Sequence, residues 1–314
     1  MHIAVLMGGW SLEREVSLSS AKGIIEAIKE LGYKVTPVDV TGDLTDLLNH
    51  LKKSSPDVIF NALHGIGGED GVIQGVLEML QIPYTHSGVT ASAIAMDKIL
   101  SRQIFSYQGI PVPDWKIISF DDFKHAHPMD FPYVVKPVKE GSSFGVSLIF
   151  TELDYQKALN TWSFGNQILV EKYIPGREIQ VAVIDGKAIG SIEIQMHSGF
   201  YDYEAKYTPG RTTHLVPAPL NPKDEKEILK LAEKAYQTLG CRGASRVDFR
   251  CDDTKEHINF YLLELNTHPG MTPLSLVPEI AAHNGMSFKD LIQIMIQTAR
   301  CDGKTKFAKS SSSF

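Results

Sequence analysis

Within the first hundred residues, short apolar runs alternate with amphipathic stretches, and this alternation limits the possible folds more than any other feature. Residues 3–7 form an unbroken apolar run, as expected of a parallel strand that is buried on both faces. Further strand patterns follow at 33–38, 57–62 and 82–85, with apolar residues at helical spacing between them. Strands that alternate with helices in this way form an open parallel sheet with right-handed crossovers. The pattern therefore predicts a parallel α/β domain over residues 1–96.

The pattern changes after about residue 96. One helix is expected to end at Tyr107, and strand patterns then follow one another closely between residues 133 and 193. A helical stretch near 153–162 interrupts them, and Asp185-Gly186 is a typical hairpin turn. These features predict an α+β unit that contains an antiparallel sheet.

A third region starts with a long helix over 224–239. Strand patterns follow at 245–250 and 260–265, and two C-terminal helices are expected to end near Ala299. The domains that we predict are an N-terminal domain at 1–96, a central subdomain at 97–184, a C-terminal subdomain at 185–306 and a Ser-rich tail at 307–314.

Composition disfavours several classes of protein. The chain has 314 residues, enough for two or three units of ~100 residues each, and a formal net charge of -6. Without a strongly basic stripe, a nucleic-acid partner is not expected. The 3 cysteines form no CxxC pair, so we expect a reduced, cytoplasmic protein with neither a disulfide framework nor a zinc site. No apolar run approaches the ~20 residues that span a membrane, and the N-terminal run lacks the basic leader of a signal peptide.

A glycine turn, Gly8-Gly9, follows the first strand and leads into a helix. Such turns expose backbone N–H groups at the positive end of the helix. The dinucleotide fingerprint GxGxxG is absent, although Asp39 ends the second strand as a ribose-binding acid would, so a nicotinamide cofactor is a minor alternative. Glu13 lies early in the helix and is expected to face the carboxyl edge of the sheet, where ligands usually bind. The alternative is an acid that only caps the helix.

Four glycines in eight residues mark the segment 64–71, which follows the third strand at the same sheet edge. Glycines permit positive φ and the close approach of a ligand, so a binding loop is favoured over a plain connection into a helix. His64, at the start of this segment, is a candidate either for orienting its neighbours or for touching a substrate.

Lys136 opens a segment of glycines and hydroxyl residues, 136–145, between two strands of the central unit. Backbone N–H donors, little steric bulk and a fixed positive charge are what a flap over a triphosphate needs. The lysine precedes the glycines, so this is not a Walker A loop, and the alternative is a solvent-exposed hairpin. At 171–174 a strand ends in residues that suit a ribose and a flat base, with an ordinary hairpin corner as the alternative.

The strongest constellation lies on two late strands. Because side chains alternate along a strand, Arg246 and Asp248 share one face, and Glu264 and Asn266 share a face of the next strand. If these strands pair, the carboxylates and the amide converge as hard oxygen ligands that suit Mg²⁺ between protein and phosphates. Arg246 beside them would stabilise charge that develops in a transition state. The alternative is a salt-bridged strand pair that faces solvent.

Together these segments resemble the D-alanine–D-alanine ligases of the ATP-grasp superfamily, from Ile3 to about Ala299. The motifs that carry the resemblance occur in the family's order: LMGGWSLEREVSL, ALHGIGGEDG, MDK, VKPVKEGSSFGVS, EKYIPGRE, YDYEAKY, SRVDF and LLELNTHPGMTPLSLVP. The resemblance implies an ATP-grasp fold of mixed α/β and α+β character, with an N-terminal Rossmann-like domain. It also implies that ATP phosphorylates the carboxylate of one D-alanine and that the amine of a second attacks this acyl phosphate. The implied product is a D-alanyl dipeptide used for peptidoglycan, and hence for the cell wall and cell shape. The implied cofactor is Mg²⁺ as two ions, with Mn²⁺ as an alternative, and the implied assembly is a homodimer.

The resemblance also assigns catalytic roles, position by position. Glu13 is similar in position to the acid that binds the ammonium group of the first D-alanine, with Ser142 and Tyr207 as its hydrogen-bonded partners. Arg246 and the backbone N–H of Gly270 would stabilise the tetrahedral oxyanion.

Other positions would hold the nucleotide, the metal ions and the second substrate. The implied ATP-binding residues are Lys98, Lys136, Glu171, Ile174, Glu178 and, from a closing loop over 197–211, Lys206. The implied metal ligands are Asp248, Glu264 and Asn266. The carboxylate of the second substrate would meet Ser275 and Leu276, and His64 is a further candidate for substrate binding.

Three residues bear on substrate choice and on departures from the family. Related ligases that make esters with D-lactate carry Phe at the position of Tyr207, so this tyrosine favours the dipeptide. His268 stands where the family commonly has a small polar residue or Gln, and Trp10 lies beside the Glu13 loop. Two alternatives stay open at this point: an ATP-grasp ligase for other amino or hydroxy acids, and a non-catalytic nucleotide-binding regulator.

Overall fold

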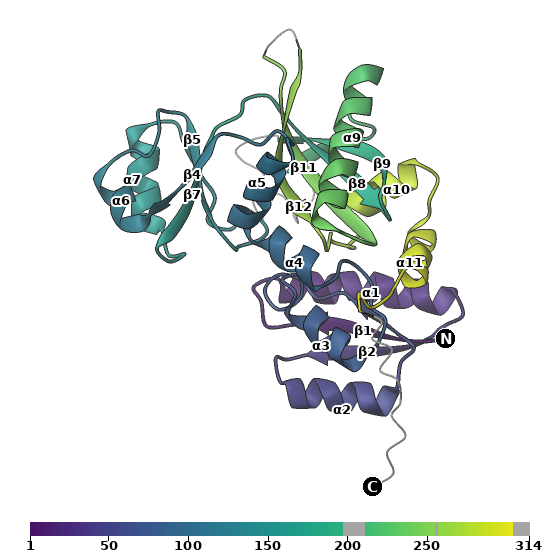
Figure 1. Cartoon of the computed structure of the whole chain (residues 1–314). Coiled ribbons are helices and arrows are strands. Elements are labelled where there is room, and N and C mark those ends of the chain that lie inside the picture. Colours follow the sequence, from purple (N-terminus) through teal and green to yellow (C-terminus); the bar gives the residue numbers. More distant parts are fainter. Residues whose placement is uncertain (197–210, 255–256, 304–314) are drawn as a thin grey trace.

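A computed structural model describes residues 1–196, 211–254 and 257–303 of the chain. Figure 1 shows an N-terminal body below, a small body to one side and a larger body above. Each body contains one sheet, and these sheets have three, four and five strands. This arrangement confirms the mixed α/β fold that the sequence predicts.

The N-terminal sheet is parallel, with the first strand in the middle. Its elements are β1 (His2–Gly8), α1 (Arg14–Glu30), β2 (Lys34–Val40), α2 (Leu44–Ser54), β3 (Val58–Asn61) and α3 (Val72–Leu80). Along β1, Ile3 and Val5 pack into the core that includes α1. Ala4 and Leu6, between them, pack on the opposite side with α2 and α3. Both faces of β1 are therefore covered, as expected of an unbroken apolar run.

The strand predicted at 82–85 is wrong in its extent. Within the described residues, this segment makes one parallel bridge, in which Tyr84 pairs with Ile59. Pro83 has no N–H to donate, and Gln81 has a positive φ of 53° as the C-cap of α3. The extended stretch is too short for a ladder, so the described sheet has three strands instead of four.

Two helices, α4 (Val89–Met96) and α5 (Lys98–Tyr107), lead away from this domain. The helix predicted to end at Tyr107 is α5. It begins after Asp97, whose carboxylate accepts hydrogen bonds from the N–H groups of the second and third helical residues. The sequence pattern does not predict α4, because its apolar and small residues lie on all sides and leave no helical period.

The small body is a four-stranded antiparallel sheet with the order β4-β7-β5-β6. Its elements are β4 (Trp115–Ser119), α6 (Phe120–His125), β5 (Tyr133–Pro137), β6 (Ser147–Ile149), α7 (Glu152–Thr161) and β7 (Gln167–Lys172). Both helices pack on one face of this sheet, where Tyr133 and Val135 are buried. Val134 and Lys136 point to the opposite face, which is left for the site.

The larger body has a five-stranded antiparallel sheet with the order β10-β9-β8-β11-β12. Its strands are β8 (Arg177–Ile184), β9 (Lys187–Met196), β10 (Thr212–Leu215), β11 (Ala244–Asp252) and β12 (Asn259–Asn266). The predicted hairpin turn joins β8 to β9, with φ of 46° at Asp185 and 86° at Gly186. β8 lies within the expected central unit, 97–184, but pairs in this larger sheet. The reason is that β8 is apolar on both faces, with Val181 in one core and Ala182 in another, so it becomes a central strand.

The described residues of this body also form α9 (Pro222–Leu239), α10 (Leu276–His283) and α11 (Phe288–Gln297). α9 covers one face of the five-stranded sheet. On the other face, α10 and α11 share a core with α1 and β1, so the larger body and the N-terminal domain are packed through common apolar residues. This shared core places the carboxyl edge of the N-terminal sheet against the end of β12.

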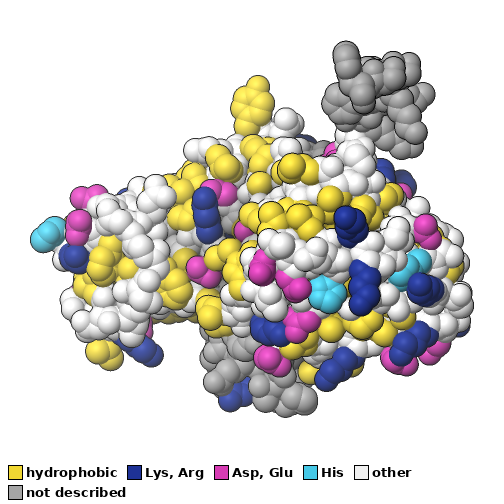
Figure 2. All heavy atoms as spheres, turned by 90° about the horizontal axis from the view of Figure 1, so that it is seen from below, with side chains coloured by type: hydrophobic (Ala, Val, Ile, Leu, Met, Phe, Trp, Pro, Cys, Tyr) yellow, Lys and Arg dark blue, Asp and Glu magenta, His cyan; other side chains and the backbone are white. Residues whose placement is uncertain are grey.

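The outer surface carries both signs of charge. On the face seen in Figure 2, Lys and Arg side chains are interspersed with Asp and Glu, and they do not gather into a stripe of one sign. Among the described residues, no helix is both long and apolar enough to cross a membrane.

Candidate active site

A cleft of about 490 Å³ separates the four-stranded sheet from the five-stranded sheet. Val134 and Leu148 line it from the first sheet, and Ile194 and Leu263 line it from the second. The cleft therefore has an apolar wall on each side and could hold a flat ring system between them. Its volume lies in the range of pockets that bind small molecules and cofactors.

Buried charges lie at the inner end of this cleft. Lys136 Nζ is 2.6 Å from one oxygen of Glu171, and Arg102 contacts the other oxygen. Burial alone would raise the pKa of the Glu171 carboxyl, but the positive charges of Arg102 and Lys136 outweigh it and hold the pKa below its ordinary value. Glu171 is thus an ion-paired residue, 1% exposed, that fixes Lys136 beside the cleft.

Arg102 was missed by sequence reasoning. Its two terminal nitrogens donate to the carbonyl groups of Leu262 and Leu263 on β12, at 2.8 and 2.7 Å. The side chain therefore links α5, β7 and β12 at once. The available signal was its spacing, because Arg102 follows Lys98 by four residues and so lies on the same helix face.

A second, smaller cavity of about 70 Å³ adjoins the cleft. Lys98, Glu140 and Glu264 line both spaces, so they mark the junction. Lys98 Nζ donates to the Glu140 carbonyl at 2.6 Å and lies 3.8 Å from a Glu264 oxygen. Burial lowers the pKa of Lys98, and the Glu264 carboxylate opposes this shift. Lys98 therefore places a fixed positive charge at the junction, where a group transferred from one space to the other would pass.

The smaller cavity collects residues from distant parts of the chain. The predicted site residues that line it are Glu13, His64, Lys98, Ser142, Arg246, Glu264, Asn266 and Gly270. The cavity is also lined by two glutamates, Glu69 and Glu140, that were not selected as site residues from the sequence. Both lie inside the motifs that carry the family resemblance.

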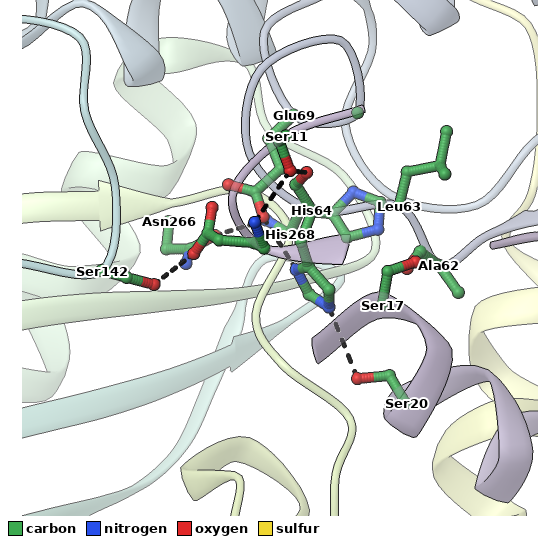
Figure 3. Close-up of polar contacts among 12 residues, drawn as sticks. Ser11, Ser17, Ser20, Ala62, Leu63, His64, Glu69, Ser142, Asn266 and His268 are labelled. Carbon is green, nitrogen blue, oxygen red and sulfur yellow. Dashed lines mark hydrogen bonds and ion pairs between the residues drawn. The ribbon is translucent and has the colours of Figure 1, made fainter. Parts of the chain in front are cut away.

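Glu13 occupies the N-cap position of α1, but its side chain makes no hydrogen bond to the helix. Instead, the carboxylate accepts a hydrogen bond from the Ser142 hydroxyl, and a dashed line from Ser142 marks this bond in Figure 3. Ser142 is presented by the loop between β5 and β6, where its φ is 48°. The alternative of a purely capping acid is therefore disfavoured, because the carboxylate faces the cavity.

The glycine loop after β3 is held by its own polar side chains. His64 Nδ1 is 2.8 Å from Glu69 Oε1, and the Ser11 hydroxyl donates to the His64 carbonyl at 2.6 Å (Figure 3). Gly65 and Gly67 have positive φ of 68° and 86°. The loop thus places His64 on the cavity wall and joins it to the Glu13 turn.

The two late strands pair as predicted. Arg246 lies opposite Asn266, and Asp248 lies opposite Glu264. Two guanidinium nitrogens of Arg246 lie 2.7 and 2.9 Å from the Asp248 oxygens. Val247 on the other face is fully buried, so the polar face is the one that meets the site.

The polar side chains of these two strands are candidate ligands for a metal ion. Among the described residues, no group of three or more His, Cys, Asp or Glu side chains could hold a metal ion. Asp248, Glu264 and Asn266 instead offer two carboxylates and one amide from adjacent strands. Hard oxygen donors of this kind fit Mg²⁺ that also takes phosphate oxygens and water.

Gly270 lies where a side chain would not fit, because a Cβ there would come within 2.7 Å of the Ser275 hydroxyl. Ser275 is the N-cap of α10, and its hydroxyl accepts a hydrogen bond from the Thr272 N–H at 2.9 Å. Leu276 is 5% exposed and packs in the core, so it offers its backbone rather than its side chain. Neither Ser275 nor Leu276 lines the two cavities described above.

Some predicted residues are placed otherwise or are not described. Ile174 and Glu178 line the large cleft as expected. Tyr207 and Lys206 lie outside the described residues. Asp39 is the second-last residue of β2, and its two oxygens accept hydrogen bonds from Arg14 at 2.8 and 2.7 Å, so it resembles an ion-paired surface acid more than a ribose ligand.

Comparison with known proteins agrees with this geometry. The family model described as D-ala D-ala ligase C-terminus matches residues 104–297, and the model described as D-ala D-ala ligase N-terminus matches residues 43–87. The chain belongs to the D-alanine–D-alanine ligase family.

Relatives of this family match almost the whole chain. The D-alanine–D-alanine ligase of Agrobacterium fabrum is 51% identical, over 96% of this chain and 98% of its own length. The D-alanine–D-alanine ligase of Rickettsia bellii (strain RML369-C) is 49% identical, over 95% of this chain and 92% of its own.

Solved structures of the family have the same fold. The crystal structure of the D-alanine–D-alanine ligase from Bacillus anthracis matches with a TM-score of 0.82 and 35% identity, covering 95% of this chain and 97% of that one. The same enzyme complexed with ATP matches with a TM-score of 0.79 and 31% identity, with the same coverage. The ATP-grasp fold and the ATP-binding ligase family are therefore established for this chain.

Proposed function

We propose that this chain joins two D-alanine molecules to D-alanyl-D-alanine, with ATP cleaved to ADP and phosphate. The observation that carries the proposal is the junction of two spaces of different size and chemistry. The large cleft has apolar walls and buried lysines, and the small cavity is lined by the carboxylate of Glu13 and the guanidinium of Arg246. A nucleotide and a small amino acid would meet where Lys98 and Glu264 line both.

An activated intermediate is needed because condensing a carboxylate with an amine in water is uphill. Transfer of the terminal phosphoryl group of ATP to the carboxylate of the first D-alanine forms an acyl phosphate. The amine of the second D-alanine then attacks the carbonyl carbon, the C–O bond to phosphate breaks, and the amine proton is released. Acyl phosphates hydrolyse in open water, so the intermediate has to form in a recess such as the small cavity.

The large cleft is the proposed ATP site. Lys136 and Lys98 offer positive charge for phosphates, and Ile174 offers an apolar surface for the base. Glu178, the second residue of β8, is the proposed partner of the ribose hydroxyls. Lys206 is proposed to reach the transferred phosphate.

Asp248, Glu264 and Asn266 are the residues that would hold Mg²⁺, as two ions or with Mn²⁺ in its place. When bound, the metal would neutralise the charge of the phosphate oxygens and hold them in place. The chain's own contribution is to present the three oxygen donors on one polar face at the junction of the two spaces.

The small cavity is the proposed site of the first D-alanine. Glu13 would pair with its ammonium group, with Ser142 and Tyr207 hydrogen-bonded nearby. Arg246 and the Gly270 N–H would stabilise the oxyanion that forms when the second amine attacks. Ser275 and the start of α10 are proposed for the second carboxylate, because a helix N-terminus favours an anion.

The wider role follows from this chemistry. The dipeptide is the product that the family supplies for peptidoglycan, so we place this chain in cell-wall synthesis in the cytoplasm. A homodimer is proposed from the family resemblance.

The test of the proposed function is phosphate release from ATP and Mg²⁺ with D-alanine, run beside L-alanine and beside D-alanine plus D-lactate. We expect release with D-alanine, no release with L-alanine, and the dipeptide mass in the product. Release only with another amino or hydroxy acid would overturn the substrate assignment. Silence with every pair would instead favour a non-catalytic nucleotide-binding protein.

A further inference from the structure

His268, the departure from the family pattern noted in the sequence, occupies a central place in the structure. It lies two residues after Asn266 and two residues before Gly270. Its backbone N–H donates to the Asn266 side-chain oxygen at 2.7 Å. The residue therefore belongs to the short segment that connects a proposed metal ligand to a proposed oxyanion donor.

The ring of His268 is held by the N-terminal domain. It is 2% exposed, and its Nε2–H donates to the Asn61 carbonyl at 2.6 Å, across 207 residues of sequence. Because a carbonyl can only accept, Nε2 carries the proton in this bond. The ring also stacks on His86 at 3.6 Å between centroids and meets the edge of His64 at 5.6 Å.

The acceptor is itself rigid. Asn61 is the last residue of β3, and it is fully buried. Its side chain donates to the Gly68 carbonyl at 3.0 Å and accepts from the Leu63 N–H at 3.2 Å. The hydrogen bond from His268 therefore ends on the carboxyl edge of the N-terminal sheet and not on a free loop.

This bond joins the two walls of the small cavity. Glu13 and His64 form the N-terminal wall, and Arg246, Asn266 and Gly270 form the opposite wall. Figure 3 shows His64, Asn266 and His268 close together at the seam where these two walls meet. The spacing of these walls decides how an amino acid held by one wall meets the charge-stabilising groups on the other.

We propose that His268 is a positioning residue that fixes the catalytic segment 266–270 against the N-terminal substrate wall through its hydrogen bond to the Asn61 carbonyl. The proposal rests on the proposed ligase function. A displacement of the oxyanion donors by about 1 Å can lower a rate by about 10²-fold, so loss of this bond should act on turnover. Asn266 itself is held by its pairing with Arg246 on β11, so nucleotide binding should be much less affected than turnover.

Two variants separate the hydrogen bond from the packing. His268→Phe keeps a flat ring in the seam but cannot donate, and His268→Gln gives up the ring but can still donate to the Asn61 carbonyl. His283→Gln, exposed at the end of α10, is the matched control. For each variant, kcat, KM for D-alanine, KM for ATP and the melting temperature are measured.

We expect His268→Phe to lower kcat by about ten-fold or more while KM for ATP stays within about two-fold of the value for the unmodified chain. We expect kcat of His268→Gln to stay within about three-fold of that of the unmodified chain, and the control to match the unmodified chain. Equal kcat in the Phe variant and the unmodified chain would overturn the proposal, as would an equal loss in the Phe and Gln variants. If the Phe variant does not fold, His268→Met replaces it, since Met fills a similar volume and also lacks a donor. An unmodified chain that is inactive with D-alanine would count against the ligase function, whereas an active chain with unchanged variants would count against His268 alone.

Discussion

At the scale of single residues, the surroundings of each site residue decide whether its side chain or its backbone can meet a ligand. Glu13 is 8% exposed, makes no capping bond and accepts from Ser142, so its charge is directed into the small cavity. Leu276 is the opposite case, because its side chain is committed to the core and only its backbone remains for a ligand. The start of α1 therefore offers Glu13 through its side chain, whereas the start of α10 offers Leu276 through its backbone.

Glu13→Gln should weaken D-alanine binding without altering ATP binding. The amide keeps the shape and can still accept from Ser142, so the change removes only the charge that would pair with an ammonium group. Loss of one partner of such a charge pair costs about 2–4 kcal/mol, so kcat/KM for D-alanine should fall by about 30- to 900-fold. Steady-state kinetics with each substrate varied in turn would measure this.

The control for that experiment is Glu15→Gln, an exposed acid in the first turn of the same helix. It makes the identical chemical change away from the cavity and should leave both KM values unchanged. Unchanged kinetics in Glu13→Gln would remove this residue from substrate binding.

At the scale of elements, the nucleotide cleft depends on how two sheets are joined. Arg102 on α5 contacts Glu171 on β7 and two carbonyl groups on β12, so one buried side chain holds the four-stranded sheet to the five-stranded sheet. A buried ion pair contributes little beyond a well-packed apolar replacement, but removal of one partner leaves an uncompensated charge.

Arg102→Met should therefore destabilise the fold by about 3–5 kcal/mol, because it leaves Glu171 buried beside a single cation. Adding Glu171→Gln should recover part of that loss. Lys124→Met breaks an exposed pair with Asp121 and should leave the free energy of unfolding nearly unchanged. Urea unfolding of the four proteins would decide, and an Arg102 variant as stable as the Lys124 variant would contradict the prediction.

At the scale of the whole molecule, the N-terminal domain and the larger body are joined by a shared apolar core and by buried histidines. His86 is 3% exposed, stacks on His268, and its backbone lies against Gly243 of the larger body. Burial first, and then the nearby charge of His64, lower the pKa of His86 from 6.5 to about 3. Interfaces of this kind respond to pH even though they lie far from solvent.

Acidification should weaken the fold through His86. In the unfolded chain its ring takes up a proton below about pH 6.5, whereas the folded chain keeps it neutral down to about 3. The contribution of neutral His86 to the free energy of unfolding is thus fully present above about pH 6.5 and is lost as the pH falls from there towards 3. At pH 5 the loss amounts to about 2 kcal/mol. Urea unfolding at pH 7 and pH 5 should show a smaller loss in His86→Asn, which tolerates the native φ of 67°. Equal losses in both proteins would exclude His86 as the source.

Much of the fold was accessible from local pattern. β7 was predicted at residues 167–172 and lies there, because a short apolar run such as Ile168 to Val170 is a local feature of a buried strand. The convergence of Asp248 and Glu264 was also accessible, since it needs only alternation and the pairing of two neighbouring strands. The short extent of the segment around Tyr84, which makes only isolated bridges to Ile59 and Arg300, was not accessible, because a neighbouring proline and a helix cap keep it from forming a ladder.

The sequence alone determined the order of the elements, the family and the residues that can carry the chemistry, because these depend on short windows and ordered motifs. The tertiary structure decided which sheet β8 joins, that Glu171 is buried between Arg102 and Lys136, and that His268 reaches Asn61. Each of these depends on contacts between residues far apart in the chain. Their free energy comes from burial and pairing that exist only once the bodies have packed together, so no local pattern could have specified them.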